Sequence, residues 1–143
     1  MLKGIDPLLN ADLLYVLMAM GHGDDLVIVD ANFPDTANAE RLVRLDGNSA
    51  TEVLAAVLTV LPLDTFVDEP CATMAPVDGG PKPEIVSEFE QIAASAEGGP
   101  VGFEQVERFE FYERAAESFA IVSTSERRLY GNVIVKKGII PPE

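Results

Sequence analysis

The single histidine of the chain, His22, lies in a short segment of glycine and aspartate residues, Gly21 to Asp25. Glycine on both sides removes side-chain crowding and lets a ligand approach the backbone closely. An imidazole changes protonation state near neutral pH, so it can donate or accept a proton in general acid–base chemistry. The segment therefore indicates a candidate proton-transfer site. A solvated or capping loop histidine has the same local pattern, and both interpretations stay open at this point.

Asp30 closes an apolar run, Leu26 to Val29, that reads as a strand buried on both faces. Ligands of open α/β sheets gather beyond the carboxyl ends of strands, so Asp30 is a candidate ligand-orienting carboxylate. A turn or capping aspartate is the alternative. His22, Asp24, Asp25 and Asp30 also have the donor types that suit several divalent ions. With one histidine and no thiolate partner, we expect no metal site.

A second polar group lies near the C-terminus, where Arg108 precedes an aromatic segment and Tyr130-Gly131-Asn132 precedes an apolar run. A guanidinium, a phenol and a carboxamide together donate and accept the hydrogen bonds that sugar hydroxyls need. Phe109 and Phe111 are expected in the core or at subunit contacts. No phosphate-binding glycine motif, nucleophile elbow or metalloprotease motif is present, so nucleotide and serine-hydrolase chemistry have no support.

Size and composition limit the class of protein. The 143 residues suit one domain, residues 1–143, with an ordinary globular balance of 48% hydrophobic and 24% charged residues. The net charge of −14 disfavours binding to nucleic acid and to membrane surfaces. The N-terminus lacks the pattern of a signal peptide, and no apolar stretch approaches the roughly 18 residues of a membrane span.

Cys71 is the only cysteine, so the chain forms no internal disulfide and suits a reducing compartment. Its apolar surroundings in the sequence favour a small core residue over a nucleophile, because the only histidine is distant along the chain.

The pattern of apolar residues and end signals predicts alternating helices and strands. Asn10 is a predicted helix N-cap, Ser49 with Glu52 has the spacing of a capping box, and Pro62 is expected to end the second helix. Predicted helices are 10–20, 49–61, 83–98 and 110–118; predicted strands are 26–30, 41–45, 119–122 and 132–135, with one or two more in 65–77 and an extended piece at 103–108. This order predicts a layered α/β/α single domain with a mostly parallel or mixed sheet.

Several motifs, in the same order along almost the whole chain, resemble the L-fucose mutarotase branch of the family shared with D-ribose pyranase. They are Met1 to Leu9, Met20-Gly21-His22-Gly23-Asp24, Asp30-Ala31-Asn32-Phe33-Pro34, Arg44 to Gly47, Arg108 to Ala115, Phe119 to Val122, Glu126-Arg127, Tyr130-Gly131-Asn132 and Lys136-Lys137-Gly138. Several motifs in order are far more specific than any single one.

The resemblance implies a cytoplasmic, cofactor-independent isomerase whose α/β subunits assemble into a homo-oligomeric ring, often a decamer, with sites near subunit contacts. It implies that His22 is the proton donor and that Asp30, Arg108, Tyr130, Gly131 and Asn132 contact the sugar. Fucose-type members often have histidine where this chain has Asn32, which affects the expected sugar preference more than the reaction type.

Mutarotation needs only acid–base groups, since the ring oxygen of the sugar gains a proton while the anomeric hydroxyl loses one. Our hypothesis is that His22 donates this proton, that Asp30 orients the sugar or the imidazole, and that Arg108, Tyr130 and Asn132 hold hydroxyls. Two alternatives remain from the sequence. One is a non-catalytic monosaccharide-binding or transport-accessory protein, and the other is a structural ring protein that binds no sugar.

Overall fold

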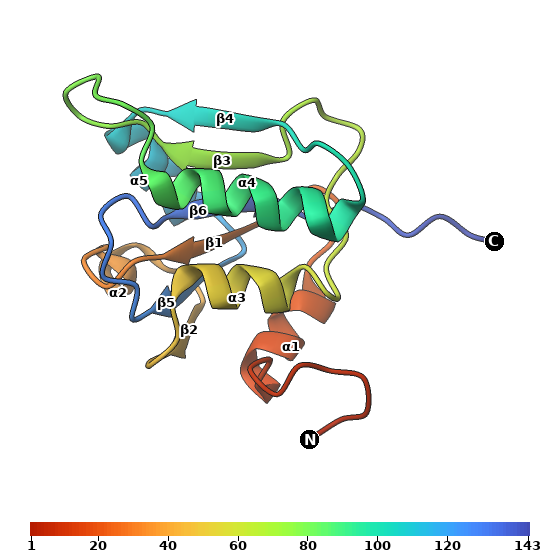
Figure 1. Cartoon of the computed structure of the whole chain (residues 1–143). Coiled ribbons are helices and arrows are strands. Elements are labelled where there is room, and N and C mark those ends of the chain that lie inside the picture. Colours follow the sequence, from red (N-terminus) through yellow and green to blue (C-terminus); the bar gives the residue numbers. More distant parts are fainter.

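A six-stranded mixed sheet forms the middle layer of the protein in the computed structural model, which describes residues 1–143 (Figure 1). The strands lie in the order β2-β5-β1-β6-β3-β4. They span β1 Asp25–Val29, β2 Leu42–Leu45, β3 Cys71–Met74, β4 Phe103–Val106, β5 Ala120–Thr124 and β6 Val133–Lys136. The helices span α1 Ala11–Ala19, α2 Asp35–Asn38, α3 Ala50–Val57, α4 Glu84–Glu97 and α5 Arg108–Glu117.

Strand direction determines which loops meet. β1 and β2 both run parallel to β5, and β3 runs parallel to β4. β6 runs antiparallel to β1 and to β3, so β1 and β3 point the same way. The carboxyl ends of β1 and β3 therefore lie at the same sheet edge as the start of β6.

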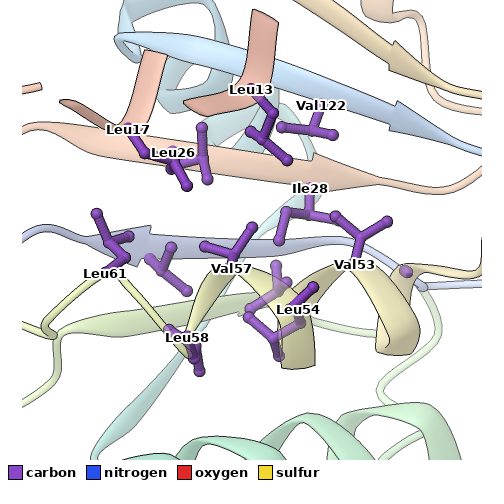
Figure 2. Close-up of a cluster of buried hydrophobic side chains, with 14 of the residues drawn as sticks. Leu13, Leu17, Leu26, Ile28, Val53, Leu54, Val57, Leu58, Leu61 and Val122 are labelled. Atoms are coloured by element: carbon purple, nitrogen blue, oxygen red, sulfur yellow. The ribbon is translucent and has the colours of Figure 1, made fainter. Parts of the chain in front are cut away.

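Helices cover both faces of this sheet, because alternate residues of each strand point to opposite sides. On one face, Leu26 and Ile28 of β1 belong to a core with residues of α1, α3 and α4. Figure 2 shows Leu13 of α1 and Val57 of α3 pointing into this core beside them. On the other face, Val27 of β1 belongs to a second core with residues of α5. The predicted α/β/α layering with a mixed sheet is confirmed.

The predicted helix starts at Asn10 and Ser49 are confirmed in atomic detail. The side chain of Asn10 accepts a hydrogen bond from the Leu13 N–H, 2.9 Å away. Ser49 and Glu52 form the reciprocal capping box, in which the Ser49 N–H donates to the Glu52 carboxylate at 2.8 Å. These contacts satisfy N–H groups that have no partner within the helix.

Three predicted boundaries were wrong. Helix α5 begins at Arg108 rather than near Glu110, because the Glu107 carboxylate accepts from the Phe109 and Glu110 N–H groups and caps the helix earlier. Helix α3 ends at Val57, before Pro62, and passes into hydrogen-bonded turns. The loop predicted after Pro34 contains the one-turn helix α2, whereas the single strand in segment 65–77 agrees with the prediction.

Cys71 is buried in β3, as predicted, and burial raises the pKa of its thiol to about 12. A thiol in this state is a poor nucleophile at neutral pH. None of the helices is both long and apolar enough to cross a membrane.

Candidate active site

A pocket of about 280 Å³ lies at the sheet edge where β1 and β3 end and β6 begins. Its lining comes from segments far apart in the sequence. The lining residues are Asp30, Asn32, Phe33, Met74, Val77, Arg108, Tyr112, Leu129, Tyr130 and Asn132. Four residues predicted from the sequence, Asp30, Arg108, Tyr130 and Asn132, are therefore brought together, and Gly131 lies between the last two.

Asp30 and Asn132 form the buried polar floor of this pocket. The backbone N–H of Asp30 donates to Oδ1 of Asn132 at 2.8 Å, and Nδ2 of Asn132 donates to Oδ2 of Asp30 at 3.1 Å. The Asn32 N–H donates to the other carboxylate oxygen of Asp30 at 3.0 Å. Burial raises the pKa of Asp30, and these hydrogen bonds oppose the shift without reversing it. The carboxylate is thus held in one orientation and open on its pocket side.

One wall of the pocket carries two phenols and the Arg108 guanidinium. Nε of Arg108 donates to the Tyr112 hydroxyl at 3.1 Å, one helical turn further along α5. The Tyr130 hydroxyl accepts from the Val77 N–H at 3.1 Å. Tyr130 has a left-handed backbone with φ of 62°, which is unusual for a residue other than glycine. Strained backbone of this kind persists where the surrounding structure holds it, and it is common at functional sites.

Met74 and Phe33 give the pocket an apolar side. Met74 ends β3 and is buried in the same core as Phe33. The ring of Phe33 packs edge-on against Tyr112, with ring centroids 5.3 Å apart. The pocket therefore offers hydrogen-bonding groups on one side and carbon on the other, the combination that a sugar with polar and apolar faces requires.

His22 lies at the opposite end of β1 from Asp30. β1 alone spans about 16 Å at about 3.3 Å per residue, so the His22 imidazole and the Asp30 pocket do not meet within one chain. Nε2 of His22 instead forms a hydrogen bond of 3.0 Å with Oδ1 of Asp64. The ring also packs edge-on against Phe66, with centroids 5.0 Å apart.

The carboxylate of Asp64 is suited to orient this histidine. Hydrogen bonds from the Phe66 N–H and from the His22 ring lower the pKa of Asp64, so the group is ionised at neutral pH. An ionised carboxylate only accepts hydrogen bonds, so Nε2 of His22 carries the proton and Nδ1 is left for another partner. His22 and Asp64 thus form an acid–base pair facing outward.

The other acidic residues beside His22 have structural partners. Asp24 accepts from the Gly21 N–H at 2.7 Å, and Asp25 pairs with Lys136 at 2.8 Å. No group of three or more histidine, cysteine, aspartate or glutamate side chains converges in a way that would hold a metal ion.

Several residues at these two places were not predicted from the sequence as site residues, among them Asp64, Met74 and Tyr112. Tyr112 follows Arg108 by four residues, a spacing that brings two side chains together on one face of a helix. The predicted helix began near Glu110 and left Arg108 outside, so this contact was not predicted. Asp64 and Met74 lie in the segment 65–77 or directly before it, where prolines obscured the strand pattern.

The model of the RbsD / FucU transport protein family matches residues 3–140, nearly the whole chain. The protein belongs to this family. A relative from Danio rerio named fucose mutarotase is 46% identical, with 99% of this chain and 96% of the relative covered. The fucose mutarotase from Streptococcus pneumoniae, solved in complex with L-fucose, is 38% identical, with a TM-score of 0.92 over 98% of this chain and 100% of that one.

A more distant member of the RbsD / FucU family has the same fold. The Bacillus subtilis RbsD, solved in complex with D-ribose, is 21% identical with a TM-score of 0.78, covering 99% of this chain and 100% of that one. The family resemblance and the fold class inferred from the sequence are both confirmed.

Proposed function

We propose that this chain is a monosaccharide mutarotase, an isomerase that interconverts the anomers of a free sugar such as L-fucose without a cofactor. The observation that carries the proposal is the near end-to-end similarity to proteins named fucose mutarotase, one of them solved with L-fucose. The pocket supports it, since Asp30, Tyr130 and Asn132 present hydrogen-bonding groups beside an apolar wall. Residues 1–143 act as one domain, and the enzyme works in the cytoplasm.

The chemistry requires two proton movements. The ring oxygen of the hemiacetal gains a proton as the anomeric hydroxyl loses one, the ring opens to the aldehyde, and it recloses on the other face. In our proposal the protonated His22 donates to the ring oxygen through Nδ1 while a water molecule accepts the proton of the anomeric hydroxyl, and the reverse transfers accompany ring closure. Asp64 stabilises the charged imidazole through its bond to Nε2. Asp30, Arg108 and the Tyr130-Gly131-Asn132 segment hold the sugar.

The separation of His22 from Asp30 calls for two subunits at each site. We propose that the His22–Asp64 pair of one subunit closes the Asp30 pocket of its neighbour in a homo-oligomeric ring, a decamer by family resemblance. The surface around His22 supports this arrangement, because Phe66 beside it is 71% exposed in the single chain and Val67 is exposed as well. Burial of such apolar side chains under a neighbouring subunit stabilises the assembly.

Saturation-transfer NMR on L-fucose tests the activity directly. The wild-type protein should accelerate exchange between the α and β anomers, and His22→Ala should lose about 10²- to 10⁴-fold of that acceleration. The same experiment with D-ribose and D-galactose establishes which sugar the protein prefers. The preference is of interest because Asn32 lines the pocket. Sugar binding without accelerated exchange would indicate a non-catalytic sugar-binding protein instead.

Mixing two inactive variants tests the shared site. His22→Ala retains an intact Asp30 pocket, and Asp30→Asn retains an intact His22–Asp64 pair. If each site combines two subunits, random co-assembly after dissociation restores about one quarter of the wild-type sites, since half of the pockets and half of the histidines are intact. A mixture as inactive as its components would exclude the shared site.

A further inference from the structure

An ion pair between the buried Glu126 and the partly exposed Arg128 lies beside the pocket segments, outside the groups assigned above. Glu126, in the loop between β5 and β6, is only 4% exposed. Its carboxylate accepts from Nε and Nη2 of Arg128, both at 3.1 Å, and from the Arg128 N–H at 3.0 Å. Nη1 of Arg128 extends outward to Glu88 of α4 at 2.7 Å. Burying a carboxylate is costly even when it is paired, so such a pair is weak evidence for a stabilising role alone.

The backbone of Glu126 is hydrogen-bonded to the end of β5 and to the turn that follows β1. Its N–H donates to Oγ1 of Thr124 at 3.1 Å, and that hydroxyl donates to the carbonyl of Val29, the last residue of β1, at 2.7 Å. Its carbonyl accepts from the N–H of Ala31, 2.9 Å away and adjacent to Asp30. The position of Glu126 is therefore coupled to the turn that carries the Asp30 carboxylate.

The side chain of Glu126 also contacts the segment that carries Tyr130 and Asn132. A Cβ added to Gly131 would lie 2.7 Å from Cγ of Glu126 and 3.1 Å from the Arg128 carbonyl oxygen. Only glycine fits this close approach. The strained left-handed backbone of Tyr130 directly precedes it. The Glu126–Arg128 pair therefore forms the surface against which residues 130–132 are placed.

We propose that Glu126 is a positioning residue for sugar binding. Its bonds to Arg128 fix the Glu126 side chain, and Glu126 in turn holds Tyr130, Asn132 and the Asp30 turn in their relative positions. This inference rests on the proposed function, because it assigns a role at the same pocket. Glu126 itself does not line the pocket and acts only through these neighbours. Its loss should therefore weaken binding of the sugar more than it slows proton transfer at His22, which lies at the other end of β1.

Glu126→Gln tests the inference, with Glu88→Gln as the matched control. Each variant removes one carboxylate charge from Arg128, but Glu88 lies on the outer side and is 39% exposed. L-Fucose is titrated into each protein by calorimetry, and anomer exchange is measured over a range of sugar concentrations. We expect Glu126→Gln to raise Kd and KM about tenfold while kcat stays within about twofold, and Glu88→Gln to match the wild type.

Arg128→Lys covers the case in which Glu126→Gln does not fold. Lysine keeps a positive charge beside the buried Glu126 carboxylate, but it lacks the rigid fork of donors with which Arg128 holds both carboxylate oxygens. This variant should raise Kd and KM in the same pattern. Folded variants of both residues that bind L-fucose as tightly as the wild type, or an equal drop in kcat with no change in KM, would overturn the inference.

The same measurements separate this inference from the proposed function. Wild-type protein that binds L-fucose without accelerating exchange would refute the mutarotase function, and the Kd values would still decide the role of Glu126. Wild-type protein that both binds and exchanges, with an unaltered Kd in the Glu126→Gln variant, would refute the role of Glu126 alone. Wild-type protein that binds no monosaccharide would refute both.

Discussion

At the scale of single residues, the polar groups of this protein form two sets with different chemical roles. Asp30 and Asn132 exchange two hydrogen bonds in a buried pocket floor, which suits holding a ligand. His22 and Asp64 form a partly exposed pair whose outer nitrogen is free, which suits proton transfer. In the proposed mechanism, sugar binding and proton transfer therefore belong to different ends of β1.

The role of Asp64 leads to a prediction at this scale. Asp64→Asn keeps an oxygen that accepts from Nε2 of His22 but removes the charge that stabilises the protonated ring. We expect kcat to fall about 10- to 100-fold with little change in stability. Asp68→Asn, at an exposed position of the same loop, is the control and should leave exchange unchanged. Full exchange in Asp64→Asn would remove this carboxylate from the mechanism.

A second prediction concerns the raised pKa of Asp30. Because the folded chain holds the Asp30 proton more tightly than the unfolded chain, the ionisation of Asp30 destabilises the fold. The contribution of Asp30 to stability is therefore complete below the ordinary pKa of 3.8 and is lost as the pH rises through the higher folded value. The free energy of unfolding of the wild type, minus that of Asp30→Asn, should decrease from pH 3 toward neutrality. Urea unfolding across this pH range measures the difference. A difference that increases with pH would contradict the raised pKa of Asp30.

At the scale of secondary-structure elements, the segment that carries Asp64 is attached to the chain just beyond β6. The Asp64 N–H donates to the Lys136 carbonyl at 3.0 Å, and the Gly138 N–H donates to the Pro62 carbonyl at 2.8 Å. A Cβ at Gly138 would lie 2.5 Å from the Leu63 carbonyl oxygen and 2.8 Å from Cα of Asp64. The two segments are therefore as close as backbone atoms allow.

This contact predicts the effect of Gly138→Ala. The added methyl group forces the 62–64 segment away, which should cost about 1 to 3 kcal/mol of stability and move Asp64 from His22. Thermal unfolding and anomer exchange should therefore both decline. Gly80→Ala is the matched control, because a Cβ there meets open space and the backbone φ is ordinary. Equal unfolding temperatures for the two variants would show that the segment adapts without cost.

At the scale of the whole molecule, charge opposes the assembly that the proposed shared site requires. Each chain carries 24 acidic and 10 basic residues, a net charge of −14. Like-charged subunits repel one another, and salt screens this repulsion over a Debye length of about 10 Å at 0.1 M. Burial of exposed apolar side chains such as Phe66 has to outweigh it.

The resulting prediction is that assembly strengthens with salt. Sedimentation analysis at low protein concentration should show a larger oligomeric fraction at about 0.5 M NaCl than at about 0.02 M NaCl. Anomer exchange per chain should rise in parallel, because each proposed site combines groups from two subunits. Dissociation on adding salt would mean that ion pairs, rather than apolar contacts, hold the subunits together.

Most secondary-structure elements and the class of fold could be predicted from the sequence. Helix caps such as Asn10 and Ser49 and the buried run of β1 depend on neighbouring residues, so they can be read from local patterns. The position of Asp30 at the carboxyl end of β1 could also be predicted, since Asp30 directly follows a buried apolar run. The end-to-end order of motifs identified the family.

Which of these residues lie next to one another could be seen only in the folded chain. The His22–Asp64 bond joins residues 42 positions apart, and the Asp30–Asn132 bonds join residues 102 positions apart. Such contacts depend on strand order and direction, which local patterns do not encode. The antiparallel insertion of β6 between β1 and β3 brings Asn132 to Asp30, while the length of β1 keeps His22 at the opposite edge.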